Sequence, residues 1–208
     1  MANNYVYVLD GKAYINLTNK CENACDFCIR NSGSGVAGTP LWLDREPTAD
    51  EVMHVFEAIK PQLRSDEVVF CGYGEPTAAL DVLKSCAKSF KAAGYKTRLN
   101  TNGLGSLSAG RDIAPELKGV IDTVSVSLNN HTAEKYLAVT HSAFGLSAFD
   151  AVTAFAKSCK AEGIYTVFTV VDTIGKEDIE ASKTLCKKLG IPLRVREYIA
   201  DNYDGDRR

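Results

Sequence analysis

Short segments typical of β-strands alternate with amphipathic, helix-like segments along most of this chain. The predicted strands are residues 13–17, 68–70, 97–101, 123–128, 165–171 and 193–195, and a helix-like apolar stripe separates each from the next. Strand–helix–strand units form right-handed crossovers and a parallel sheet. We therefore expect an α/β fold, a partial (β/α)6 TIM-like barrel with parallel strands.

Local signals define the amino-terminal part of this pattern. Residues 5–9 and 13–17 flank Asp10-Gly11, a dipeptide typical of a two-residue turn, and so predict an N-terminal hairpin. Thr48 and Glu51 form a capping box at the start of the first helix. The helical signal is weakest at residues 110–118. The second strand of the hairpin leads directly into a cysteine-bearing loop.

That loop carries Cys21, Cys25 and Cys28 in a CxxxCxxC spacing, which can place three thiolates around a metal cluster. A four-iron cluster normally takes four thiolates, so three leave one iron open for a substrate or cosubstrate. A zinc site would need a fourth ligand, and the nearest histidine is His54. Zinc sites also favour paired CxxC motifs. The spacing therefore favours an iron-sulfur cluster over zinc.

The remaining cysteines have a different setting. Cys86, Cys159 and Cys186 each fall on the apolar side of a predicted helix, where a free cysteine behaves as a small hydrophobic residue. We expect these three to pack in the core and see no second cluster in them. Cys71 ends a predicted strand, and its role stays open.

Length and composition limit the class of protein. The 208 residues, 45% apolar, can bury a full core and suggest one domain over residues 1–208, with a cluster loop at 18–46 and a polar tail at 201–208 that we expect to fray. Residues 1–4 lack the features of a signal peptide, and no apolar run reaches membrane-spanning length, so we expect no membrane partner. Seven cysteines at irregular spacing suit a reducing compartment, and we expect a cytoplasmic protein. A net charge of -2 without a basic stripe argues against nucleic acid as a partner.

Several predicted strands alternate apolar and polar residues, unlike the continuous apolar strands of an ordinary parallel barrel. The polar positions are Arg98, Asn100 and Asn102, then Ser125, Ser127 and Asn129, and finally Arg194 and Arg196. Unpaired polar groups in a dry core would cost a few kcal/mol each, roughly, so we expect a wet lumen that holds a polar ligand. The alternative is a solvated sheet face without function.

The carboxyl ends of the strands, where barrel and open-sheet enzymes place their chemistry, are also unusual. One strand ends in Gly72-Tyr73-Gly74-Glu75-Pro76, the next in Thr101-Asn102, and another in Asp172. Glycines let the backbone approach a ligand closely, and Glu75 can accept a hydrogen bond from an ammonium group. These ends therefore predict a ligand site beside the cysteine loop.

The cysteine motif, with Phe27 before its third cysteine, resembles the signature of the radical S-adenosylmethionine (SAM) superfamily. In that family the three cysteines hold a 4Fe-4S cluster whose open iron takes the amino and carboxylate groups of SAM. Gly74, Glu75 and Pro76 resemble the last three residues of the family's Gly-Gly-Glu-Pro motif, which helps to hold the SAM amino group. Tyr73 replaces the first glycine, which puts the backbone carbonyl contacts in doubt.

The resemblance covers nearly the whole chain and implies further site residues. Together the residues implied for cofactor binding are Phe27, Gly72, Gly74, Glu75, Pro76, Thr101, Asn102, Ser125, Ser127, Asn129, Asp172 and Arg196, of which Asp172 is the loosest match. Trp42-Leu43, Val170-Val171-Asp172 and the segment 194–198 resemble the small branch of the family associated with TatD-family nucleases.

The implied function is reductive cleavage of SAM to a 5′-deoxyadenosyl radical, which abstracts hydrogen from a small-molecule or protein substrate. An external one-electron reductant of the flavodoxin or ferredoxin type would be a partner. Arg194 and Arg196, with Arg98 across the lumen, suggest an anionic substrate, and the alternative is internal pairing with Glu197, Asp172 or Asp201. Three other readings stay open: an activase of glycyl-radical enzymes, the ring-contracting enzyme of deazapurine biosynthesis, and a non-enzymatic metal-binding module.

Overall fold

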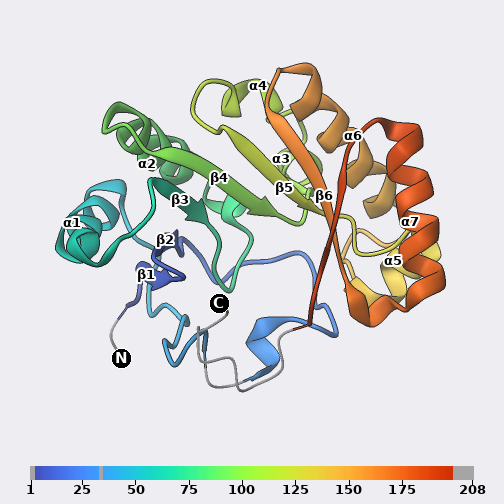
Figure 1. Cartoon of the computed structure of the whole chain (residues 1–208), viewed down its shortest axis with the longest axis horizontal. Coiled ribbons are helices and arrows are strands. Elements are labelled where there is room, and N and C mark those ends of the chain that lie inside the picture. Colours follow the sequence, from blue (N-terminus) through green and yellow to red (C-terminus); the bar gives the residue numbers. More distant parts are fainter. Residues whose placement is uncertain (1–2, 33–34, 199–208) are drawn as a thin grey trace.

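The computed structural model describes residues 3–32 and 35–198, and these contain one seven-stranded sheet (Figure 1). The strands, in the order in which they pair, are β1 (Val6–Leu9), β2 (Lys12–Ile15), β3 (Glu67–Phe70), β4 (Lys96–Thr101), β5 (Thr123–Ser127), β6 (Tyr165–Val171) and β7 (Leu193–Arg196). β1 pairs with β2 antiparallel, and all later neighbours are parallel. The sheet is unclosed, with β1 and β7 at its edges. The expected partial barrel of six parallel strands with an N-terminal hairpin is confirmed.

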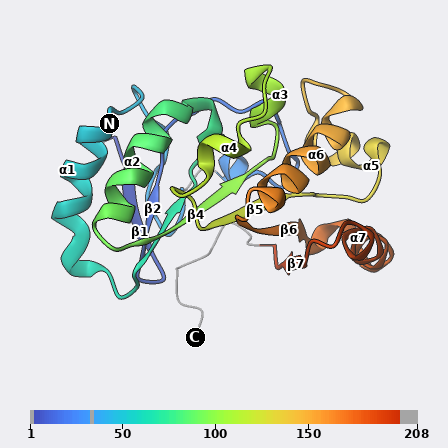
Figure 2. The same ribbon diagram turned by 90° about the horizontal axis from the view of Figure 1, so that it is seen from above.

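The helices connect successive strands. They are α1 (Ala49–Ile59), α2 (Leu80–Ala92), α3 (Gly105–Ala109), α4 (Ala114–Leu117), α5 (Ala133–Thr140), α6 (Ser147–Ala161) and α7 (Lys176–Leu189), with short 3-10 helices at Ile29–Ser32, Lys60–Gln62, Pro76–Ala79 and Asp172–Ile174. Figure 2 shows α1, α2, α4 and α6 on one side of the sheet. None of the helices in the described parts of the chain is long and apolar enough to cross a membrane.

The sequence patterns were incomplete between β4 and α6. The weak helical stretch expected around residues 110–118 is confirmed only at Ala114–Leu117, because Gly110 caps α3 in the left-handed conformation and α4 begins after it. α3 and α5 carry weak apolar patterns and were not expected. α5 begins where the Thr132 side chain accepts a hydrogen bond from Lys135 N, and it ends at His141, which has a φ of 49°. Local capping therefore defines α5 better than periodicity does.

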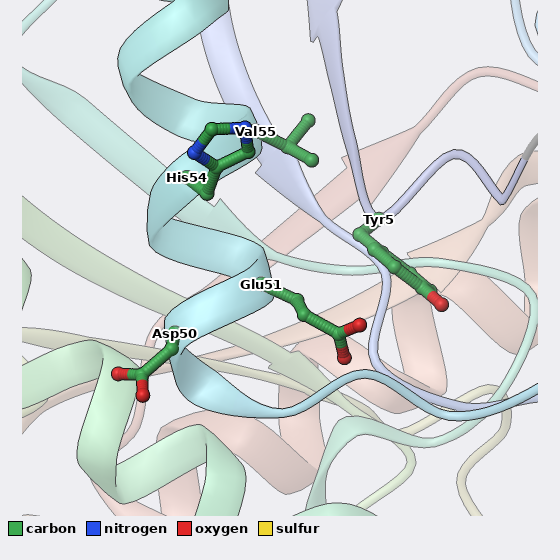
Figure 3. Close-up of a pocket in the computed structure, with 5 residues that line it drawn as sticks. All are labelled: Tyr5, Asp50, Glu51, His54 and Val55. Atoms are coloured by element: carbon green, nitrogen blue, oxygen red, sulfur yellow. The ribbon is translucent and has the colours of Figure 1, made fainter.

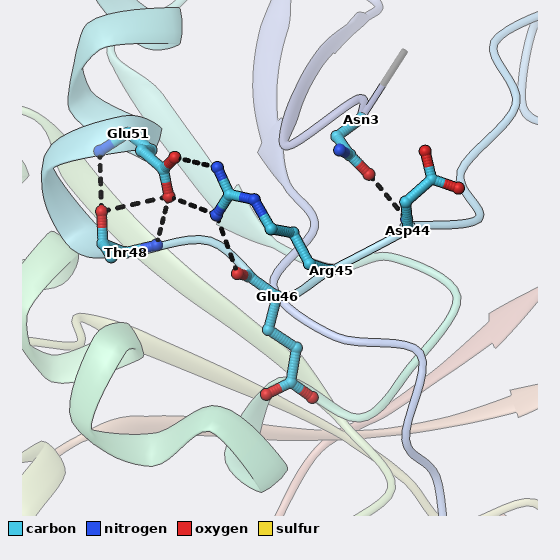
Figure 4. A network of polar contacts seen from close by, with 6 residues as sticks. All are labelled: Asn3, Asp44, Arg45, Glu46, Thr48 and Glu51. Carbon is cyan, nitrogen blue, oxygen red and sulfur yellow. Dashed lines mark hydrogen bonds and ion pairs between the residues drawn. The ribbon is translucent and has the colours of Figure 1, made fainter. Parts of the chain in front are cut away.

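The amino-terminal turn and cap form as expected. Asp10 and Gly11 have φ angles of 51° and 72°, the two positive values that a type I′ hairpin turn requires. The capping box of α1 has both of its hydrogen bonds, from Glu51 N to Thr48 Oγ1 and from Thr48 N to Glu51 Oε2. Arg45 forms an ion pair with the same Glu51 carboxylate (Figure 4). These contacts fix where α1 begins after the long cysteine loop.

The sheet has one apolar and one polar face. Val124, Val126 and their counterparts on neighbouring strands are fully buried in the main hydrophobic cluster, which they share with the helices. Cys86, Cys159 and Cys186 lie in this cluster, as expected for packing residues. The opposite face, which we call the polar face, carries Tyr14, Arg98, Asn100, Ser125, Thr169, Arg194 and Arg196, related by strand register and alternation.

Candidate active site

The three loop cysteines lie beside the carboxyl ends of β3 and β4. Glu75, which follows β3, donates its backbone N–H to Lys20 O at 2.7 Å. Asn102, which follows β4, donates from Nδ2 to Cys21 Sγ at 3.8 Å and to Glu22 Oε2 at 3.1 Å. Figure 1 shows the segment after β2, in blue, running along the lower side of the sheet. The predicted meeting of cysteine loop and strand ends is therefore formed.

The thiols of the motif are half-buried and close to one another. Burial, together with the neighbouring Cys21 and Cys28, raises the pKa of Cys25 to about 12. Arg30 donates from Nε to Cys28 Sγ at 3.3 Å and from Nη2 to Asn23 O at 3.0 Å. Because thiolates repel one another here, the trio suits a cationic group that binds all three and offsets the cost of their ionisation.

The described residues contain no group of three His, Cys, Asp or Glu side chains that could hold a single metal ion. A four-iron cluster takes each thiolate on a different iron, so its ligands need not converge on one point. The donor set fits that group: three soft sulfur atoms on one loop, with Arg30 and Asn102 donating hydrogen bonds to two of them.

The cysteine loop is anchored by α5 and the residues that follow it. Ala24 N donates to Thr140 O at 2.9 Å and Asp26 N to Val139 O at 3.1 Å. The buried Asn23 donates from Nδ2 to Tyr136 Oη at 3.2 Å. The sequence did not predict this anchor, because its contacts join segments more than 100 residues apart. It did not predict the role of Arg30 either, because Arg30 lies outside the cysteine motif. An arginine two positions after the third cysteine was the one available signal.

Glu75 is a buried hydrogen-bond acceptor that links two strand ends. Its Oε1 accepts from Thr77 N, Thr77 Oγ1 and Thr101 Oγ1, at 3.1, 2.8 and 2.7 Å, and its Oε2 accepts from Asn102 N at 2.7 Å. Burial raises the pKa of Glu75, and these hydrogen bonds oppose the shift. The carboxylate thus holds Asn102 against the cysteine loop, and one acceptor position on Oε2 is left for a ligand.

Gly72 and Gly74 are required by close packing against the chain after β2. A Cβ on Gly72 would lie 2.0 Å from Asn16 Oδ1, and one on Gly74 would lie 2.3 Å from Thr18 O. Tyr73, the departure from the family motif, is buried and packs edge-on against Trp42, with ring centroids 5.2 Å apart. These three residues therefore bring the end of β3 against the cysteine loop, and the buried Pro76 begins the next 3-10 helix.

The other predicted residues lie at the carboxyl ends of β5, β6 and β7. Ser125 is buried and accepts a hydrogen bond from Arg194 Nη2 at 3.2 Å, while Ser127 is half-buried. Asn129 is buried and has a φ of 60°. Asp172 is exposed, and its Oδ1 accepts from Tyr198 N at 2.9 Å. None of these side chains forms a hydrogen bond or ion pair with the cysteine loop among the residues that the structure describes. Their cofactor roles stay predictions, as do those of the half-buried Phe27 and the exposed Arg196.

A separate pocket of about 350 Å³ lies between β1 and α1, lined by Tyr5, Asp50, Glu51, His54 and Val55 (Figure 3). It contains none of the predicted site residues. Its Glu51 carboxylate is already engaged in the capping box and with Arg45. We therefore place the candidate active site at the cysteine loop and not at this pocket.

Solved structures show the same fold in larger proteins. The chain superposes on a structure titled "Native anSMEcpe with bound AdoMet" with a TM-score of 0.67, 17% identity and coverage of 90% of this chain and 51% of that one. For Streptococcus suis SuiB bound to S-adenosylmethionine the TM-score is 0.61 and the identity 18%, with coverage of 90% of this chain and 38% of that one. For HydG, a maturase of the [FeFe]-hydrogenase, the TM-score is 0.58 and the identity 16%, with coverage of 93% of this chain and 44% of that one. The chain thus spans about half or less of each of these proteins.

Sequence comparison is more specific about the family. No curated protein matches the chain. The family model described as the radical SAM superfamily matches residues 15–186, which include the cysteine loop and β3 to β6. The chain therefore belongs to the radical SAM superfamily, whose members are enzymes that use S-adenosylmethionine and a 4Fe-4S cluster.

Proposed function

We propose that Cys21, Cys25 and Cys28 hold the 4Fe-4S cluster of a radical SAM enzyme that acts on an anionic substrate. The observation that carries this proposal is that Asn102, held by Glu75, contacts Cys21, and that Cys25 and Cys28 lie close to Cys21 on the same loop. When bound, the cluster supplies the electron that cleaves SAM to the 5′-deoxyadenosyl radical, which takes a hydrogen atom from the substrate.

The protein's own groups position and shield this chemistry. Arg30 and Asn102 donate hydrogen bonds to sulfur and so stabilise negative charge on two of the ligands. Glu75 holds Asn102 in place, and its remaining acceptor position suits the SAM ammonium group. Ser125, Ser127 and Asn129 on β5 offer hydroxyl and amide groups for the ribose and carboxylate. Buried Tyr73 and Leu41 exclude water on the side of β1.

The proposal includes an external one-electron reductant of the flavodoxin or ferredoxin type. It also places the enzyme in the cytoplasm, a reducing compartment that suits seven free cysteines. Within the superfamily we assign the chain to the branch associated with TatD-family nucleases, on the segments around Trp42, Val170 and Arg194.

The test is anaerobic purification followed by incubation with SAM, a reductant and cell extract. We expect bound iron and labile sulfide, and 5′-deoxyadenosine that rises above the uncoupled background when extract is added. The variant with Cys21, Cys25 and Cys28 all changed to Ala is the control and should produce none. If the wild-type protein held iron but released no 5′-deoxyadenosine, the proposed enzyme activity would be wrong and the protein would be a metal-binding module.

A further inference from the structure

The polar face of the sheet carries three arginines, Arg98, Arg194 and Arg196. Arg98 lies three residues before Thr101, the last residue of β4, which places its Cα about 10 Å below the carboxyl end of that strand at 3.3 Å per residue. Arg194 on β7 reaches inward and donates from Nη2 to Ser125 Oγ at 3.2 Å. Arg196 lies two residues further along the same strand and on the same face.

The sheet curls enough to bring these arginines near the opposite edge. β1 and β7 are six strand spacings apart, roughly 29 Å in a flat sheet. Yet burial raises the pKa of Tyr7 on β1, and the charge of Arg196 on β7 opposes that shift. Burial likewise raises the pKa of Tyr14 on β2, and the charges of Arg98 and Arg196 oppose that shift. The arginines therefore share one region of the polar face with two phenol groups.

The three arginines also act on one another. The Glu67 carboxylate lies 2.6 Å from Lys12 Nζ and 3.6 Å from Arg98 Nη2, so Arg98 shares this carboxylate with a second cation. Burial and the charges of Arg98 and Arg196 lower the pKa of Arg194. The positive charges of neighbouring arginines repel one another, and a bound anion would relieve that repulsion.

Two buried polar atoms in the same region have no partner. Arg98 Nε and Asn100 Oδ1 are buried without a hydrogen bond, although the Arg98 side chain is 14% exposed. Leaving a buried donor unpaired destabilises a protein, and a charged donor does so more than a neutral one. A guanidinium offers parallel N–H groups that match carboxylate and phosphate oxygens. The unpaired Arg98 donor therefore points to a ligand that brings oxygen atoms.

We propose that Arg98 and Arg194, with Arg196 beside them, bind a carboxylate or phosphate group of the substrate on the polar face. This proposal rests on the proposed function, since it assigns the substrate of that enzyme. The depth of Arg98 along β4 separates this group from the cysteine loop, where the family places the SAM carboxylate. The rest of the substrate would then extend from the arginines toward the carboxyl edge, where its hydrogen is abstracted.

The test is titration of the reconstituted holoenzyme, in the presence of SAM, with inorganic phosphate or with succinate at constant ionic strength set by chloride. Isothermal calorimetry should show saturable binding of phosphate, of succinate or of both. The anion that binds identifies the substrate group as a phosphate or a carboxylate. Arg194→Met should weaken that binding by about tenfold or more. Arg194→Lys keeps the positive charge but loses the parallel N–H donors of the guanidinium, so its affinity for the anion should lie between those of the wild type and Arg194→Met. Arg111→Met is the matched control, because Arg111 pairs with Glu116 on the helical side and should change nothing.

Saturating anion should also suppress the extract-dependent rise in 5′-deoxyadenosine while leaving uncoupled SAM cleavage unchanged. Binding no tighter than that of chloride, or equal binding by Arg194→Met, would overturn the proposal. Loss of SAM binding in Arg194→Met would also overturn the proposal, because it would show that Arg194 binds the cofactor and not the substrate. Iron content and uncoupled 5′-deoxyadenosine, measured on the same samples, report on the proposed function independently of the anion titration.

Discussion

Two sets of three cysteines in this chain show what separates a candidate ligand from a packing residue. Burial raises the pKa of Cys186, on α7, to about 11, and no charged neighbour contributes. Burial also raises the pKa of Cys25, to about 12, but there Cys21 and Cys28 add to the shift. The helical thiols are buried and the loop thiols are half-buried. What distinguishes the loop set is that its thiols face one another and receive hydrogen bonds from Arg30 and Asn102.

The largest effect should come from removing one set and keeping the other. Changing Cys21, Cys25 and Cys28 together to Ala should abolish iron binding and brown absorbance, whereas the wild type should hold about four irons and four sulfides per chain. The matched control changes Cys86, Cys159 and Cys186 to Ala. Iron and sulfide assays on both proteins decide the comparison, and iron that follows the helical set would reverse it.

Glu75→Ala should have the next largest effect, since it removes the acceptor for Asn102 N, Thr77 N and the Thr101 hydroxyl. Each buried donor left unpaired costs about 1–3 kcal/mol, so we expect a loss of roughly 3 kcal/mol in the free energy of unfolding. SAM affinity, measured by calorimetry, should fall more than in Ser127→Ala or Asn129→Ala. Equal affinity in all three variants and the wild type would remove these strand ends from the SAM site.

Arg30→Leu should change the cluster without removing it. The variant loses the hydrogen bond to Cys28 Sγ and a positive charge, and both losses should lower the midpoint potential of the cluster. A redox titration followed by spin resonance measures this, and Arg111→Leu provides the control for loss of a surface arginine. An unchanged potential at full iron content would show that the Arg30 contact with sulfur has no electronic role.

Single substitutions in the helical set should have the smallest effect. Cys86→Ala or Cys159→Ala leaves a small gap in the apolar cluster and should cost about 1 kcal/mol in the free energy of unfolding. Chemical denaturation curves measure the cost, and iron content should stay at the wild-type value. A cost well above this, with loss of iron, would mean that the helical thiols support the cluster loop.

The sequence by itself determined the features that depend on near neighbours. The Asp10-Gly11 turn, the capping box of Thr48 and Glu51, the six parallel strands and the packing of the helical cysteines all follow from spacings of a few residues, which limit backbone geometry directly. The spacing of Cys21, Cys25 and Cys28 and the Gly74-Glu75-Pro76 motif also indicated the family before any fold was known.

Only the tertiary structure decided which distant groups meet. Cys21 and Asn102 are 81 residues apart in sequence, and Asn23 and Tyr136 are 113 apart. The role of α5 as the anchor of the cysteine loop could not be read from its weak apolar pattern, because the anchor consists of backbone carbonyls that hold Ala24 and Asp26 and of the Tyr136 hydroxyl that holds Asn23. The approach of Arg194 to Ser125 likewise depends on how strongly the sheet curls. Curling and loop docking depend on the packing of the whole molecule, and no short sequence spacing specifies them.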